Sequence, residues 1–102
     1  MRVIAAKTVR LMARRHPLGA HALLRWLELA QQAQWQNLTH VRSVFPHADE
    51  VKTASGRSAV VFNIAGNKYR LITAIHYNRQ QLFVMLLLTH ADYSKERWKA
   101  DL

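Results

Sequence analysis

The feature that most constrains this chain is a change in the spacing of its apolar residues near residue 50. Before that point, apolar side chains recur every three or four residues, which is typical of helices with one buried face. After it, apolar and β-branched residues alternate with polar ones or run continuously, which is typical of strands. Helices followed by strands indicate an α+β fold.

Two helices are expected in the first half. The longer covers 20–33, and its buried stripe consists of Leu23, Leu24, Leu27, Ala30 and Gln31. A shorter basic helix covers 7–15, and Pro17 and Gly19 separate the two. The pair predicts a helical hairpin, with Trp26 and Trp35 sealing the edges of the longer helix.

The remaining segments follow from the same patterns. A short strand is expected over 2–5 and a long connection over 37–49. Four further strands, joined by tight turns, are expected over 50–53, 59–64, 69–77 and 82–88. The last strand is a continuous apolar run, which favours the centre of the sheet.

A final helix is expected from Thr89, with Asp92 three residues later as a weak capping box and with Tyr93, Arg97 and Trp98 along it. The 102 residues are short enough for a single domain over 1–102. The predicted fold is therefore α+β: an N-terminal helical hairpin packed on an antiparallel β-meander of about four strands, with a short C-terminal helix.

The charge of the chain points to a polyanionic partner. Fifteen Lys and Arg against six Asp and Glu give a net charge of +9, and ten of the cations are Arg, which suits phosphate contacts. RNA, DNA, a ribosome, an acidic protein or an anionic membrane surface would fit. The longest apolar run, Leu82–Leu88, is too short to span a bilayer. No secretory signal is indicated, so a cytoplasmic location is expected.

Several kinds of chemistry lack their sequence motifs. Cysteine is absent, and no GxxxxGK[ST], GxGxxG or GxSxG motif occurs. The six histidines form neither an HExxH motif nor a pair four residues apart. We therefore expect no metal site and no cofactor.

One group of polar residues remains as a candidate site. Asn63 and Arg70 flank a tight turn at 65–68, and alternation along the strands places them on one face, away from the helices. At the end of the neighbouring strand follow His90, Tyr93 and Lys95. A basic site with a few titratable groups and no metal is what acid–base cleavage of RNA requires.

The runs VFNIAGNKYRL at 61–71 and LTHADY at 88–93 resemble the HigB-type toxins of bacterial toxin–antitoxin systems. The opening strand, the helices and Val44-Phe45-Pro46 are similar too, so the resemblance covers nearly the whole chain. Ala65 stands where many relatives carry a second glycine. The resemblance implies a RelE-like fold, an mRNA endoribonuclease that typically acts on the translating ribosome, and a HigA-type antitoxin with a helix-turn-helix domain as partner.

In such an enzyme the RNA supplies its own nucleophile, the 2′-OH, and the protein moves protons and stabilises charge. Arg70 is assigned to stabilise the phosphorane, and His90 and Tyr93 to transfer protons, with base and acid left open. Asn63, Lys68 and Lys95 are expected to contact the RNA. Arg14 and Arg15, with Arg10 and Arg25, form a basic helical surface that would dock on ribosomal RNA or on the antitoxin.

Each assignment has a structural alternative. Arg70 could be an exposed strand residue, His90 could hydrogen-bond a turn, and Tyr93 could anchor the last helix. The function has alternatives as well: a non-catalytic basic module that binds RNA or the ribosome, or an interaction protein whose charge serves assembly with an acidic partner.

Overall fold

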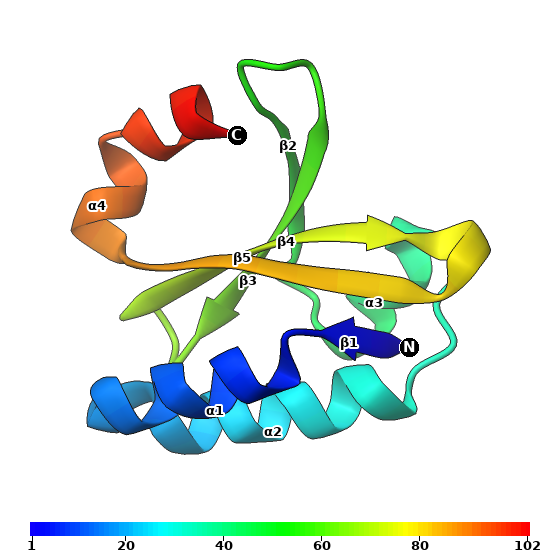
Figure 1. Cartoon of the computed structure of the whole chain (residues 1–102), viewed down its shortest axis with the longest axis horizontal. Coiled ribbons are helices and arrows are strands. Elements are labelled where there is room, and N and C mark those ends of the chain that lie inside the picture. The colour runs from blue at the N-terminus through cyan, green and yellow to red at the C-terminus, as the bar shows by residue number, and fades with distance from the viewer.

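Two helices cover one face of a five-stranded sheet, and the C-terminal segment lies over the other face (Figure 1). This computed structural model describes residues 1–102. Its helices are α1 (Ala6–Arg15), α2 (Ala20–Gln32), α3 (Leu38–Val44) and α4 (His90–Ser94). Its strands are β1 (Arg2–Ile4), β2 (Asp49–Lys52), β3 (Ser58–Ile64), β4 (Tyr69–His76) and β5 (Gln81–Thr89). The predicted α+β architecture is confirmed.

The strands are ordered β1-β5-β4-β3-β2 in the sheet. The pairs β2–β3, β3–β4 and β4–β5 are antiparallel and form the predicted meander. The predicted first strand is present as well, but it joins the sheet as a fifth strand that runs parallel to β5. The chain between β1 and β5 passes through α1, α2, α3 and the other three strands, and this long connection makes the parallel pairing possible.

The main core lies between the helices and the sheet. Alternation places Val60, Phe62, Ile64 and Leu71 on the helix-facing side, where they meet Leu23 and Leu27 of α2. Trp26 and Trp35 were expected at the edges of α2, and this was wrong. Both are buried in the core, where the rings of Trp26 and Phe62 lie 5.3 Å apart, because Trp26 follows Leu23 at helical spacing and falls on the buried stripe.

The expected long connection contains a helix, α3. Asn37 caps it by accepting a hydrogen bond from the backbone N–H of His40 at 3.0 Å. Val41 is fully buried and holds the helix against the core. The prediction missed α3 because it is seven residues long and only one of its residues is fully buried.

The apolar run 82–88 was expected at the centre of the sheet, and β5 is indeed an interior strand, between β1 and β4. β1 pairs only with Gln81–Phe83, so the outer edge of the later part of β5 has no partner strand. The middle strand of the five is β4. A register shift between β4 and β5 at Ile72/Thr73 adds a bulge to this region.

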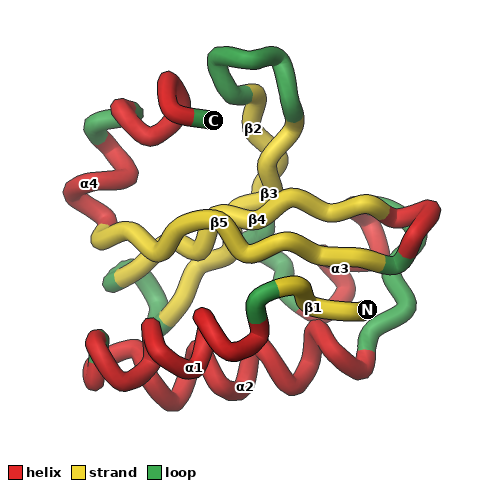
Figure 2. Tube along the Cα trace, viewed as in Figure 1, coloured by secondary structure: helices red, strands yellow, loops and turns green.

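The C-terminal helix begins as predicted but is shorter. Thr89 caps α4 by accepting from the N–H of Asp92 at 3.2 Å. The helix ends at Ser94, and Glu96 takes a left-handed conformation that turns the chain back over the sheet (Figure 2). Arg97 and Trp98 therefore lie on a separate 3₁₀ turn, Arg97–Asp101, and not on the helix.

That 3₁₀ turn closes a small second core on the sheet face away from α1 and α2. Trp98 is buried there against Ala59, Val61 and Ile72. The carbonyl of Lys99 accepts a hydrogen bond from the N–H of Ala54 at 2.9 Å. No helix of the chain is both long and apolar enough to cross a membrane.

Candidate functional site

Arg70 and Asn63, which were expected to share one face beside the turn, are direct cross-strand partners. They face each other across β3 and β4, one pair away from the turn that joins the two strands. The Arg70 guanidinium donates to the carbonyl of Tyr69 at 3.1 Å and to Oδ1 of Asn67 at 3.5 Å. Two contacts and partial burial orient the guanidinium and leave donor positions free for an anion.

Tyr93 lies beside this guanidinium. The Arg70 Cζ atom is 5.8 Å from the centroid of the Tyr93 ring, within the range of a cation–π contact. The same ring stacks on Trp98 with centroids 5.4 Å apart and an interplanar angle of 20°. The Trp98 Nε1–H also donates to the carbonyl of Tyr93 at 3.2 Å. The second core thus holds Tyr93 against Arg70.

The surroundings of Tyr93 keep its hydroxyl protonated. Burial raises the pKa of the Tyr93 phenol, and the Asp49 carboxylate raises it further, while the charges of Lys99 and Arg70 oppose that rise. The net effect is a pKa above the ordinary value of 10.0. At neutral pH this side chain can therefore donate a proton but cannot accept one.

His90 lies at the same end of the sheet, but its ring makes no hydrogen bond to Arg70 or Tyr93. Its backbone N–H donates to the carbonyl of Lys68 at 3.2 Å, which ties the start of α4 to the β3–β4 turn. The exposed ring has its Nδ1 atom 3.4 Å from the Ser94 hydroxyl. The imidazole is therefore accessible beside the Arg70–Tyr93 pair and not part of it.

The two predicted lysines flank this group. Lys68 is exposed in the β3–β4 turn, and Lys95 is exposed just after α4. Lys95 forms an ion pair with Asp92 at 3.8 Å, which offsets part of its charge. Both ammonium groups are accessible to a polyanion that approaches Arg70.

Arg14 and Arg15 do not belong to the group of polar residues around Arg70. They end α1, in the helix layer on the other side of the sheet (Figure 1). The next residue, His16, packs its ring edge-on against Tyr69, with centroids 5.3 Å apart. Tyr69 is the residue that precedes Arg70 on β4. These two arginines are exposed and make no contact with Arg70 or Tyr93.

The sequence favoured a turn-fixing role for Asn67 and a packing role for Trp98, and it did not indicate Asp49 as a member of this site. Asp49 pairs with Val61 in the β2–β3 register, which puts its side chain on the face that carries Asn63. It also forms an ion pair with Arg42 of α3 at 3.5 Å. No sequence signal indicated this placement, because it depends on the register between β2 and β3.

A pocket of about 720 Å³ opens on the same face, on the other side of the C-terminal turn. Ala59, Ala74 and Met85 give it an apolar part, and its polar lining includes Arg57, His76 and Asp101. His76 lies on the same face of β4 as Arg70 but six residues further along the strand. About 20 Å therefore separates the two residues.

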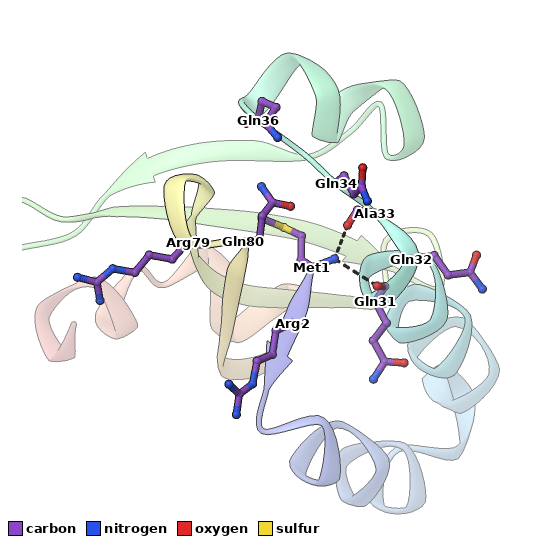
Figure 3. A pocket seen from close by; sticks show the side chains of 9 residues that line it. All are labelled: Met1, Arg2, Gln31, Gln32, Ala33, Gln34, Gln36, Arg79 and Gln80. Carbon is purple, nitrogen blue, oxygen red and sulfur yellow. Dashed lines mark hydrogen bonds between the residues drawn. The ribbon is translucent and has the colours of Figure 1, made fainter.

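A second hollow of about 480 Å³ lies where β1 meets the end of α2. Figure 3 shows Met1 in it, with its amino group donating to the carbonyls of Ala33 and Gln31. Its lining is mostly glutamine, with Arg2 and Arg79 as the charged side chains. In neither hollow, nor elsewhere in the chain, do three His, Asp or Glu side chains lie close enough to hold a metal ion.

Comparison with known proteins assigns the chain to a family. Residues 19–96 match the model of the HigB toxin family, described as the RelE-like toxic component of a toxin–antitoxin system. The chain is also similar to the mRNA interferase toxin HigB of Escherichia coli K12, with 23% identity over 93 residues that cover 91% of this chain and 88% of the relative. The mRNA interferase HigB of Shigella flexneri is similar to the same extent.

The family match spans α2 to α4 and so includes the Asn63–Arg70 pair, His90 and Tyr93. It agrees with the fold and with the resemblance read from the 61–71 and 88–93 runs. The chain therefore belongs to the HigB family of RelE-like toxins, the toxic components of toxin–antitoxin systems.

Proposed function

We propose that this chain is an endoribonuclease that cleaves mRNA on the translating ribosome without a metal ion. Family membership supports this proposal, and so do the names of the relatives in Escherichia coli and Shigella flexneri. The observation that carries it is the Arg70–Tyr93 pair: a guanidinium and a neutral phenol side by side on an open, basic sheet face.

In the proposed reaction, a 2′-OH of the RNA attacks the adjacent phosphorus atom. The new O–P bond forms as the bond to the 5′-oxygen breaks, which leaves a 2′,3′-cyclic phosphate and a 5′-hydroxyl. The phosphorane carries extra negative charge, and the Arg70 guanidinium stabilises it through charge-assisted hydrogen bonds.

Tyr93 is the proposed general acid. Its phenol is protonated at neutral pH and so holds a proton for the departing 5′-oxygen, and the neighbouring charges of Lys99 and Arg70 oppose the rise in its pKa. His90 is the proposed base, because its imidazole is exposed and lies at the same end of the sheet as the Arg70–Tyr93 pair. Since its ring does not contact Arg70, bound RNA would have to lie between them.

The proposed RNA contacts of Lys68, Lys95 and Asn63 surround the same pair. Lys68 and Lys95 attract the phosphates on either side of the cleaved bond, and the amide of Asn63 orients a phosphate or a base. A HigA-type antitoxin with a helix-turn-helix domain is the proposed protein partner, since the family is defined by toxin–antitoxin pairs.

The test is induction in growing bacteria, followed by mapping of the 5′ ends of translated mRNA. Wild-type protein is compared with Arg70→Ala, His90→Ala and, as matched control, Arg79→Ala. Arg79 is an exposed cation on a 3₁₀ turn outside the group at Arg70. We expect growth arrest and new 5′ ends with wild type and Arg79→Ala, and neither with Arg70→Ala.

Ribosome sedimentation distinguishes the proposed enzyme from the alternative, a non-catalytic module that binds RNA or the ribosome. If wild-type protein is folded, abundant and ribosome-bound but leaves messages intact, the cleavage proposal fails and a basic binding module is left. If wild type and Arg70→Ala cleave equally, Arg70 has no part in the chemistry.

A further inference from the structure

The outward face of α1 carries a stripe of cations with a leucine among them. Lys7, Arg10, Leu11 and Arg14 follow the i, i+3, i+4, i+7 spacing and are all exposed, opposite the buried Val9 and Ala13. Leu18 follows in the turn after the helix. We call Lys7, Arg10, Leu11, Arg14 and Leu18 the α1 stripe.

The positive charge of this helix is not balanced within the chain. The first acidic residue of the sequence is Glu28, and none of the ion pairs involves α1. Lys7 also lies in the first turn, where the helix dipole disfavours a cation, and no side chain caps that end. Like charges at Arg10 and Arg14 repel, because residues four apart are neighbours on a helix. The free protein thus keeps an unfavourable arrangement that an acidic partner would relieve.

The two leucines identify the kind of partner. Leu11 is 41% exposed on α1 and Leu18 is 71% exposed in the turn that follows it, so each presents apolar surface to solvent. Phosphate backbones take up cations and polar donors and leave apolar side chains uncovered. A polypeptide with both carboxylates and apolar side chains would cover both parts of the stripe.

We propose that the α1 stripe is the docking site for an acidic, amphipathic segment of the antitoxin. Carboxylates of that segment pair with Lys7, Arg10 and Arg14, while its apolar face covers Leu11 and Leu18. The stripe lies on the helix layer, across the sheet from Arg70 and Tyr93 (Figure 1). Docking there is independent of the RNA chemistry proposed above, so each can fail alone.

Three fluorescein-labelled probes test this surface on the full chain. The first is an 18-residue helical peptide with leucine at every third or fourth position and glutamate between. The second has the same composition in scrambled order, and the third is a 20-nucleotide poly-U RNA. We expect the wild-type protein to bind the patterned peptide about tenfold more tightly than the scrambled one.

Variants locate the binding. Arg10→Glu is expected to weaken binding of the patterned peptide about tenfold. The double variant Leu11→Gln/Leu18→Gln is expected to weaken that binding several-fold. The control is Arg79→Glu, which changes the net charge equally at an exposed cation outside the stripe and should leave binding within about twofold.

The unfolding temperature distinguishes a docking role of Arg10 from a structural one. A glutamate at 10 stands four residues before Arg14 and three after Lys7, which are both favourable spacings for ion pairs. Arg10→Glu should therefore keep or raise the unfolding temperature, although it binds the patterned peptide more weakly. The proposal is overturned if patterned and scrambled peptides bind alike. It is also overturned if Arg10→Glu weakens poly-U as much as the peptide and the leucine variant changes neither, since the stripe would then be an RNA surface.

Discussion

At the scale of single residues, Tyr93 combines packing with chemistry. Its ring stacks on Trp98 and faces the Arg70 guanidinium, and these contacts belong to the ring and not to the hydroxyl. Replacing it with Phe keeps the ring and removes the proton donor. We expect Tyr93→Phe to slow cleavage of ribosome-bound mRNA by about 10²- to 10⁴-fold. The free energy of unfolding should change by less than about 0.5 kcal/mol.

Single-turnover cleavage and urea unfolding measure the two effects. Tyr93→Ala is the companion variant, because it also removes the ring and should lose stability as well as activity. An undiminished rate in Tyr93→Phe would leave Tyr93 as an anchor of α4 without a role in proton transfer.

Tyr77 offers a test of buried polarity away from the site. Its hydroxyl is buried and has no hydrogen-bond partner in the chain. Because an unsatisfied buried hydroxyl is costly, Tyr77→Phe should stabilise the fold by about 1 kcal/mol at pH 7. Urea unfolding measures this, and a loss of stability would show that the hydroxyl is satisfied.

The same tyrosine predicts how stability depends on pH. Burial raises the pKa of the Tyr77 phenol, and the Glu50 carboxylate raises it further. The unfolded chain therefore gives up this proton first, at about pH 10. The stability held below that pH falls as the pH rises above it. Tyr77→Phe should lose less stability between pH 9 and pH 11 than the wild type, and equal losses would contradict the raised pKa.

At the scale of elements, Gly19 sets how closely the helix layer approaches the β3–β4 end of the sheet. A Cβ atom at this position would lie 2.8 and 2.9 Å from two ring atoms of Tyr69. That ring is packed against His16, and the Tyr69 carbonyl accepts from Arg70. We expect Gly19→Ala to cost about 1–3 kcal/mol of stability through overpacking, measured by urea unfolding.

Gly66→Ala is the comparison, because a Cβ there meets nothing within 4 Å and only the positive φ of 67° opposes it. Its cost should be about 1–2 kcal/mol, from backbone strain alone. A second mutation that shortens Tyr69, Tyr69→Leu, should relieve part of the Gly19→Ala loss and none of the Gly66→Ala loss.

The elements differ in how far the sequence could predict them. α2 and the meander strands were predictable because each has one face against a core, which imposes a period on the residues. The helix α3 was not, since burial of Val41 alone sets no period and its strongest local signal was the cap at Asn37. The end of α4 at Ser94 could not be predicted either, because it depends on the packing of Trp98 against a distant sheet face.

The candidate site shows the same division. The Asn63–Arg70 pairing could be predicted from the turn between their strands, because a short turn sets the register on both sides. The contact between Arg70 and Tyr93 could not, since it requires the position of α4 relative to β4. The approach of Asp49 to Tyr93 involves β2 as well, and alternation within one strand says nothing about a third element.

At the scale of the whole molecule, part of the excess positive charge lies on two separate surfaces. One is the α1 stripe in the helix layer, and the other surrounds Arg70 on the opposite face. A single positive molecule can therefore hold an acidic protein and an RNA in different places. This division predicts that the cations of the two surfaces differ in how they contribute to RNA binding.

The salt dependence of RNA binding measures that difference. A 2′-O-methyl RNA lacks the free 2′-OH, so it can bind without being cleaved. Its binding constant should fall linearly with salt concentration on logarithmic axes, and each lost phosphate contact should reduce the slope by about 0.7. Lys68→Ala should show this reduction in full. Lys95→Ala should show less, because Asp92 already offsets part of its charge. Arg10→Glu should leave the slope unchanged, and a reduction as large as that of Lys68→Ala would place RNA on α1 and contradict the division.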